Sequence, residues 1–297
     1  DIDAVLIRQQ YAYKVPSYKR KPWSGWSGSL WSWGYNSIGE LGLGNRTDYS
    51  SPVQVGTLTN WSSIAAGGYH TIATKTDGTL WAWGQNTQGQ LGQGNTTNLS
   101  SPVQVGTLTN WSSIAGGYRH TIATKTDGTL WSWGSNYNGR LGLGDTTHRS
   151  SPVQVGSLTN WSLVACGEYH TIATKTDGTL WSWGMNDFGQ LGQGDRTNRS
   201  SPVQVGTLTN WSLIAGGKYH TIATKTDGTL WSWGRNDQGS LGQGNITHRS
   251  SPVQVGSLTN WSLIAGGYYH TIATKTDGTL WSCLLYTSDA ADDTPCV

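Results

Sequence analysis

Histidine is the residue type best suited to chemistry in this chain of 297 residues, because imidazole binds metal ions and titrates near neutral pH. Five histidines recur at a constant spacing of 50 residues, namely His70, His120, His170, His220 and His270. The ligands of a zinc site must converge to about 2 Å from the ion. Histidines at one register of successive repeats are held one repeat apart. We therefore expect them to be buried, hydrogen-bonded to backbone and free of metal.

Other patterns resemble catalytic or phosphate-binding motifs but lack a necessary partner. Gly39, Gly42 and Gly44 are spaced like a glycine-rich phosphate loop, which needs a helix N-terminus behind it, and none is predicted. Ser50 and Ser51 have no paired base, and neither a G-x-S-x-G nor an H-E-x-x-H motif occurs. We expect no catalytic residues, no cofactor and no enzymatic activity.

The recurring residues belong to tandem repeats of 50 residues. The motif Trp-Ser/Ala-Trp-Gly begins at Trp31, Trp81, Trp131, Trp181 and Trp231, without insertion or deletion between repeats. Full units cover 61–110, 111–160, 161–210 and 211–260, with a partial unit at each end, 27–60 and 261–282. Repeats of this length are typical of solenoids and propellers.

Each repeat carries signals for four short strands. The β-branched segment 70–76 is followed by the turn dipeptide Asp77-Gly78 and by a second strand at 79–83, which is a strong hairpin signal. Residues 61–65 and 52–55 supply two further strands, and no segment has a helical apolar period. The sequence therefore predicts an all-β chain.

A tandem array of four-stranded units favours a β-propeller, because one such sheet cannot bury both faces unless neighbouring sheets stack on it. Alternation along a strand directs Leu80 and Ala82 to one face and Trp81 and Trp83 to the other. The prediction is a propeller of four-stranded, 50-residue blades with about five blades present.

The motif G-x-x-H-T-I-A, followed by D-G-T-L-W-S-W-G-x-N-x-x-G-Q-L-G-x-G and P-V-Q-V, resembles the repeat of the regulator of chromosome condensation family over residues 27–282. The resemblance implies a β-propeller, usually of seven blades. The chain then carries either a truncated seven-bladed ring or a five-bladed ring in which 27–60 and 261–282 complete one blade together.

The same resemblance implies a small GTPase or chromatin as partners and guanine-nucleotide exchange as a function. Exchange by the family's namesake depends on a wedge inserted into one blade. The constant spacing of 50 residues leaves no room for a wedge within these repeats, so exchange is the alternative and not the first choice.

The two ends of the chain depart from the repeat. Residues 1–26 are expected to form an irregular linker before the repeats of 27–282. The pattern requires Trp-Gly at 283–284, but Cys283 begins a segment that resembles a translated sequencing adapter, so 283–297 is interpreted as a non-native tail. Cys166 replaces Ala or Gly of other repeats and is expected to pack as a small residue.

The repeats differ most between the third and fourth strands, at 35–49 and the equivalent positions of later repeats. Variable loops on a rigid scaffold are typical of partner binding, although drift after duplication would give the same pattern. The residues expected to bind a protein partner are Tyr35, Ile38, Glu40, Gln85, Gln88, Tyr137, Arg140, Met185, Phe188 and Arg235. The predicted function is a non-catalytic protein-interaction scaffold. A carbohydrate-binding propeller is a further alternative, which requires the Trp31 and Trp33 series to reach solvent.

Composition narrows the classes of partner. The chain has 19 Lys and Arg against 17 Asp and Glu, a formal charge of +2, which argues against a nucleic acid partner. No run of 18 apolar residues occurs, so we expect no membrane-spanning helix, and three cysteines cannot form a disulfide scaffold. The 18 tryptophans supply a large apolar core instead.

Overall fold

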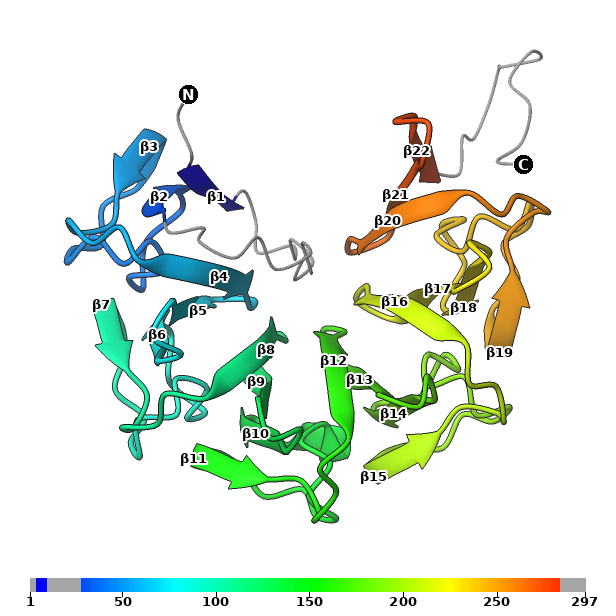
Figure 1. The fold of residues 1–297 in the computed structure, drawn as a ribbon, viewed down its shortest axis with the longest axis horizontal. Helices are drawn as coiled ribbons and strands as arrows, with labels where there is room; N and C mark the ends of the chain where they lie inside the picture. Colours follow the sequence, from blue (N-terminus) through cyan, green and yellow to red (C-terminus); the bar gives the residue numbers. More distant parts are fainter. Residues whose placement is uncertain (1–3, 10–27, 284–297) are drawn as a thin grey trace. The chain divides into compact units, whose positions relative to one another are not determined.

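The structure, a computed structural model, describes residues 4–9 and 28–283. Within these ranges the chain is made of β-strands, and its only helical segment is the short 3₁₀ turn η1 (Tyr137–Gly139) (Figure 1). No helix in the described ranges has the length and hydropathy needed to cross a membrane. The predicted all-β fold is confirmed.

Four strands recur in each repeat. The first strands are β4 (Trp61–Ala66), β8 (Trp111–Gly116), β12 (Trp161–Cys166), β16 (Trp211–Gly216) and β20 (Trp261–Gly266). The second strands are β5 (His70–Lys75), β9 (His120–Lys125), β13 (His170–Lys175), β17 (His220–Lys225) and β21 (Thr271–Lys275). The third strands are β2 (Ser29–Gly34), β6 (Leu80–Gly84), β10 (Leu130–Gly134), β14 (Leu180–Gly184), β18 (Leu230–Gly234) and β22 (Leu280–Cys283). The fourth strands are β3 (Tyr49–Gln54), β7 (Leu99–Gln104), β11 (Arg149–Gln154), β15 (Arg199–Gln204) and β19 (Arg249–Gln254).

These strands form propeller blades. Four complete antiparallel sheets contain β4–β7, β8–β11, β12–β15 and β16–β19, and three-stranded sheets contain β1–β3 and β20–β22. The predicted fold class, a β-propeller of four-stranded blades, is therefore confirmed.

The first sheet contains a strand that the sequence analysis did not predict. Within the expected linker of 1–26, β1 (Ala4–Gln9) pairs in parallel with β2. Its apolar residues favour a strand but have no counterpart in the repeat, so comparing repeats does not reveal it. The remainder of that linker, and the tail from 284 onward, lie outside the described residues.

The Asp-Gly turn closes the central hairpin of each complete blade. In the β5–β6 hairpin, the backbone N–H and Oγ1 of Thr79 both donate to Asp77 Oδ1, at 2.9 and 2.6 Å, which lowers the pKa of Asp77. Gly78 adopts a φ of +77°, and a Cβ there would lie 2.0 Å from the carbonyl oxygen of Thr109. The turn therefore requires glycine for both conformation and space.

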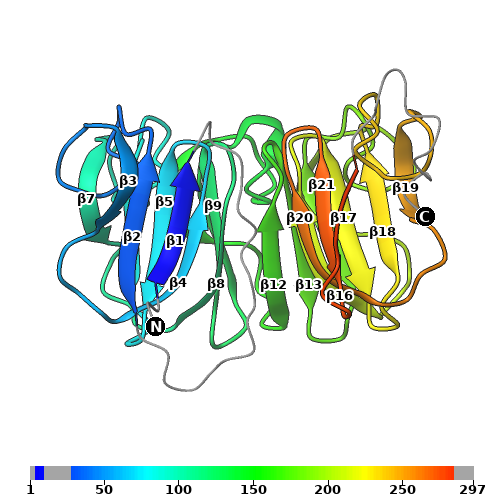
Figure 2. The same cartoon turned by 90° about the horizontal axis from the view of Figure 1, so that it is seen from above.

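The chain divides into two compact units. Unit 1 contains β1–β11, and unit 2 contains β12–β22 together with segment 138–146 of the β10–β11 loop. Within each unit the strands run along one direction, so the connections collect at two ends of the blades (Figure 2). The long-loop end carries the connections between third and fourth strands, such as 35–48. The Asp-Gly end carries the hairpin turns and the connectors between blades, such as 55–60.

The core of unit 1 lies between its blades. Leu80 and Ala82 pack with Trp133 of the next sheet, whereas Trp83 packs with Leu30 of the preceding one. The predicted alternation of faces is thus confirmed, and Trp83 and Trp133 are completely buried. In unit 2, Trp233 occupies the same kind of position against Ile172 and Leu180.

Candidate protein-interaction surface

Each long loop is folded around one buried asparagine. In the loop 185–198, the Asn186 side-chain amide donates to the carbonyl oxygens of Asp195 and Thr197, both at 3.1 Å, and its Oδ1 accepts the N–H of Leu191 at 2.9 Å. The Asn186 N–H donates to Asn198 Oδ1 at 2.7 Å. Equivalent bonds surround Asn36 and Asn236. These bonds give the loops a defined shape despite their variable sequence.

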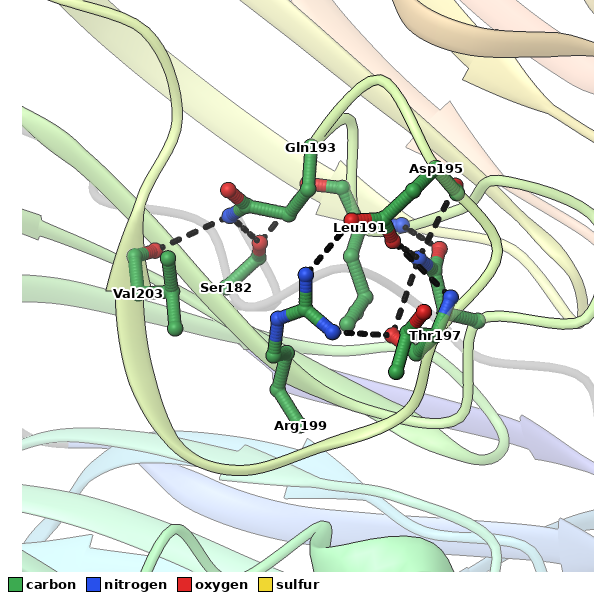
Figure 3. Close-up of polar contacts among 8 residues, drawn as sticks. Ser182, Leu191, Gln193, Asp195, Thr197, Arg199 and Val203 are labelled. Atoms are coloured by element: carbon green, nitrogen blue, oxygen red, sulfur yellow. Dashed lines mark hydrogen bonds and ion pairs between the residues drawn. The ribbon is translucent and has the colours of Figure 1, made fainter.

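Further polar contacts tie this loop to the strands beside it (Figure 3). Arg199 pairs with Asp195 at 2.5 Å. The pKa of the Asp195 carboxyl is lowered, mainly by the hydrogen bond from the backbone N–H of Thr197 and also by the contact with Arg199. The amide of Gln193 donates to Ser182 Oγ at 3.0 Å and to the carbonyl oxygen of Val203 at 3.1 Å. The loop is therefore a firm support for the side chains that it carries outward.

The recurring histidine takes part in a set of hydrogen bonds between neighbouring blades, centred on a threonine hydroxyl, which we call the threonine lock. The carbonyl oxygen of Gln90 accepts hydrogen bonds from Thr121 Oγ1 at 2.8 Å and Trp133 Nε1 at 3.0 Å, both in the next sheet. His70 Nε2 lies 3.0 Å from the same Thr121 hydroxyl. Because that hydroxyl already donates to Gln90, it accepts from His70, which fixes the Nε2–H tautomer. Burial lowers the pKa of His70 to about 3, so the ring is neutral.

Four of the five histidines are buried as predicted, whereas His270 is half-buried. The predicted backbone partner was wrong for His70 and His170. The partner is a threonine hydroxyl of the next blade, as in His70–Thr121 and His170–Thr221. In the described part of the chain, no three His, Cys, Asp or Glu side chains gather as the ligands of a metal ion would.

The structure separates the ten predicted binding residues into three groups. Tyr35 and Tyr137 are 48% and 58% exposed. The half-buried group is Ile38, Gln88, Met185, Phe188 and Arg235. The buried group is Glu40, Gln85 and Arg140.

The expectation that Glu40, Gln85 and Arg140 are displayed on the surface was wrong. Glu40 and Arg140 are buried in their loops, and their backbone carbonyls accept hydrogen bonds from threonine hydroxyls of the next sheet. Glu40 Oε2 accepts the N–H of Ile38 at 2.8 Å, and burial raises its pKa. The Arg140 guanidinium lies 5.1 Å from the ring centre of Tyr169, and Gln85 Oε1 accepts from Gln90 at 3.2 Å.

Two of the half-buried residues of unit 2, Phe188 and Arg235, lie in one cluster. The ring centre of Phe188 lies 5.0 Å from that of Tyr219, and Arg235 lies 5.0, 5.4 and 5.2 Å from the rings of Phe188, Tyr219 and Tyr269. Asp237 accepts two hydrogen bonds from Arg235, at 2.8 and 2.5 Å. Two loops that are 50 residues apart in sequence thus present a shared aromatic and cationic surface.

A second set of surface residues, not predicted from the sequence, lies in the short turns between first and second strands. These turns reach the long-loop end, because the carbonyl oxygen of Tyr69 accepts the N–H of Gln85 at 2.8 Å. Tyr69 contacts Tyr118 with ring centres 5.5 Å apart, and a hydrogen bond between them raises the pKa of Tyr69. The signal in the sequence that could have identified these residues is the variation between repeats at the two positions before each histidine, such as 68–69.

In unit 2 the same turns extend the Phe188 cluster. Tyr169 stacks on Tyr219 at 5.5 Å, and Lys218 Nζ lies 3.6 Å from the ring centre of Tyr268. We give one name, the aromatic loop surface, to these residues in both units, each unit being described by itself. Its unit 1 part is Tyr35, Tyr69, Tyr118, Arg119 and Tyr137, and its unit 2 part is Tyr169, Phe188, Lys218, Tyr219, Arg235, Tyr268 and Tyr269. All of these residues are half-buried or exposed.

The tryptophans of the complete blades are not part of this surface. Trp83, Trp133, Trp183 and Trp233 are completely buried. Trp81, the other indole of its strand, carries Lys75 Nζ 3.4 Å from its ring centre and meets Trp61 edge-on. In the complete blades one indole of each pair is therefore buried and the other is half-buried, which leaves little exposed indole for the carbohydrate-binding alternative.

Known structures share this architecture. The yeast RCC1 (Prp20) structure with bound Kap60 is similar with a TM-score of 0.74 and 25% identity, covering 85% of this chain and 63% of that one. Prp20p from Saccharomyces cerevisiae, described with its binding properties to Gsp1p and histones, has a TM-score of 0.72 and 25% identity, with 85% and 65% covered. Human WBSCR16 has a TM-score of 0.71 and 21% identity, with 83% and 71% covered. The chain thus spans slightly less than two thirds of the yeast structures.

The comparison of sequences gives the family. No curated protein matches the chain. The profile described as the regulator of chromosome condensation (RCC1) repeat matches residues 27–74, 77–124, 127–174, 177–224 and 227–274. A second profile of that description matches 61–90, 111–140, 161–190 and 211–240. This chain therefore belongs to the regulator of chromosome condensation (RCC1) repeat family.

Proposed function

We propose that the chain is a non-catalytic protein-interaction scaffold that binds a protein partner through the aromatic loop surface. The observation that carries this proposal is the gathering of partly exposed tyrosine, phenylalanine and arginine side chains on anchored loops. Phe188, Tyr219, Arg235 and Tyr269 are the best-defined group, with Arg235 between 5.0 and 5.4 Å from each of the three rings.

The residue types and their support suit binding. Tyrosine and arginine are enriched among the residues that dominate interface energies. Side chains that already contact each other on a firm loop lose little conformational freedom when a partner covers them. The charges are largely paired within the surface, as in Arg235–Asp237 and Lys218–Glu168, so aromatic contact supplies the affinity more than net charge does.

The first partners to test are those described for a similar protein. Prp20p is described with binding properties to Gsp1p and histones. We propose binding of a protein of this kind without acceleration of nucleotide exchange. The repeats keep a constant 50-residue spacing and have no inserted wedge. For the alternative function, nucleotide release from a panel of small GTPases is measured with and without the chain. Release at the background rate supports the scaffold, and acceleration supports exchange.

The binding surface is tested with two matched triple variants. The first is Tyr35→Ala, Tyr137→Ala and Tyr269→Ala, which removes three exposed side chains of the aromatic loop surface. The control is Leu58→Ala, Leu108→Ala and Leu208→Ala, which removes leucines that are 45–46% exposed at the Asp-Gly end.

Calorimetry with Gsp1p and with histones measures the affinity of each variant. We expect the tyrosine variant to lose at least about tenfold in affinity, because tyrosine is enriched among the interface residues whose truncation costs about 2 kcal/mol or more. The leucine control should keep the affinity and the thermal midpoint of the parent. Equal losses in the two variants, or an unaffected tyrosine variant, would contradict the assignment of the surface.

A further inference from the structure

Each long loop is closed by a hydrogen bond to the side chain of its last residue. The backbone N–H of the buried loop asparagine donates to the side chain of Asp48, Asn98, His148, Asn198 or His248. The acceptor is an oxygen at 2.7 Å in the first, second and fourth loops, and an imidazole Nδ1 in the third and fifth. An imidazole nitrogen accepts only while the ring is neutral, whereas an amide oxygen does not titrate. The two histidines therefore make this bond dependent on pH.

His248 of unit 2 also contacts the aromatic loop surface. Its Nδ1 accepts the N–H of Asn236 at 3.0 Å, so the proton of the neutral ring lies on Nε2. The imidazole meets Phe188 edge-on, with ring centres 5.5 Å apart. Phe188 in turn contacts Tyr219 and Arg235. One imidazole thus joins the closing bond of its own loop to an aromatic ring of the preceding loop.

The charged groups that act on His248 come from the same two loops. Burial is the largest influence and lowers the pKa of His248; Arg196 and Arg235 lower it further, and Asp237 opposes them. Asp237 already accepts two hydrogen bonds from Arg235. The closed loop therefore binds a proton on His248 less readily than an opened loop does, and acid favours opening.

Protonation of His248 removes the acceptor of the closing bond. Nδ1 then carries a hydrogen and faces the N–H of Asn236, so two donors oppose each other. Asn236 is completely buried, and its N–H reaches water only if the imidazole moves and the loop opens. The same movement takes the imidazole away from Phe188 and displaces the backbone next to Arg235. Both residues belong to the aromatic loop surface.

We propose that His248 is a pH-sensitive support of the unit 2 part of the aromatic loop surface, which holds its protein partner while the imidazole is neutral and releases it when the imidazole is protonated. This inference rests on the proposed function, because it assigns a regulation to the same surface. The chemical change is the replacement of a ring acceptor by a ring donor opposite Asn236. The loops that carry Phe188 and Arg235 are the elements that respond.

The first experiment needs no partner. Hydrogen exchange of the full chain is followed by NMR between pH 7.5 and 5. We expect the protection factor of the Asn236 amide to fall by about threefold or more as His248 is protonated. The amide of Asn186, which donates to Asn198, is the internal control and should change less. Constant protection of Asn236, or an equal fall at Asn186, would overturn the proposal.

The matched variant is His248→Asn, because Asn98 and Asn198 make the same closing bond through an oxygen that does not titrate. In this variant the Asn236 amide should keep its protection at pH 5. A fall as large as in the parent would show that a group other than His248 controls the loop.

The second experiment measures partner binding by calorimetry with Gsp1p and with histones at pH 7.5 and 5. Both proteins compared carry His148→Asn, because His148 accepts the equivalent N–H in unit 1 at 2.9 Å. One of them also carries His248→Asn. The affinity at pH 7.5 divided by that at pH 5 should be at least about threefold larger in the protein that keeps His248. The partner's own titration, and any constant effect of losing the ring beside Phe188, cancel in this comparison.

The outcomes separate the two proposals. Equal ratios in the two proteins, with binding retained at pH 7.5, would overturn the regulation by His248 and leave the proposed function intact. Absence of binding at pH 7.5 would overturn the proposed function and the release of a partner with it, while the exchange of the Asn236 amide still decides whether His248 controls the loop.

Discussion

At the residue scale, the recurring histidine is a structural group whose neutrality matters. His70 donates to Thr121 in the next blade, and burial lowers its pKa to about 3 from 6.5. The unfolded chain therefore binds a proton at this residue below about pH 6.5, whereas the folded chain does so only near pH 3. The contribution of His70 to the free energy of unfolding is therefore fully present above about pH 6.5, and it falls as the pH decreases from about 6.5 to about 3.

The prediction at this scale concerns the pH dependence of unfolding. Between pH 6 and 4, His70 should contribute a fall of about 1.4 kcal/mol per pH unit to the free energy of unfolding. Denaturant titrations of the parent and of His70→Gln at pH 7.5, 6 and 5 measure this contribution. The variant should be less stable at pH 7.5 but lose less stability on acidification. An identical pH dependence in the two proteins would contradict a neutral, buried His70.

At the element scale, the long loops need glycine where they approach the next sheet. Gly89 has a φ of +79°, and a Cβ there would lie 2.5 Å from Ser150 Cα. Gly106, in a connector at the Asp-Gly end, has a φ of +61° with nothing within 4 Å of a Cβ. The two glycines share a left-handed backbone conformation, but only Gly89 lacks room for a Cβ. Comparing them therefore distinguishes the cost of backbone strain from the cost of a steric clash.

The prediction at this scale compares two alanine substitutions. Gly106→Ala should lower the free energy of unfolding by about 1–2 kcal/mol, the cost of a left-handed alanine. Gly89→Ala should cost at least about 1 kcal/mol more, because backbone must move to admit the methyl group. Urea denaturation of both variants measures the difference. Equal costs would mean that the loop does not contact β11 as described.

At the scale of the whole molecule, stability comes from stacking of neighbouring sheets within each unit. The shared apolar clusters and the threonine locks join each sheet to the next, as in repeat proteins whose stability depends on nearest-neighbour contacts. Breaking one lock should therefore weaken the two sheets that it joins more than the rest of the chain.

The prediction at this scale uses Thr121→Val, which keeps the side-chain shape and removes the hydroxyl. The buried N–H of His70 is left without its acceptor, so the free energy of unfolding should fall by about 1–3 kcal/mol. Hydrogen exchange should increase mainly in β4–β7 and β8–β11. Thr57→Val, at an exposed position, is the control and should change neither quantity. A uniform increase in exchange over both units would contradict local coupling.

The sequence by itself determined the repeat, the four strands of a blade, the Asp77-Gly78 turn and the opposite faces of Leu80 and Trp83. All of these follow from local rules of turn chemistry and side-chain alternation. It also located the variable loops that carry Tyr35, Tyr137 and Phe188.

Only the tertiary structure decided which loop residues face outward and what the histidines bind. Glu40 and Arg140 are buried where their carbonyls bond to the next sheet, and Tyr69 and Tyr219 join the surface because their turns reach the same end of the blades. These outcomes depend on contacts between residues about 30 to 50 positions apart in neighbouring blades, and single-sequence patterns carry no information on such contacts.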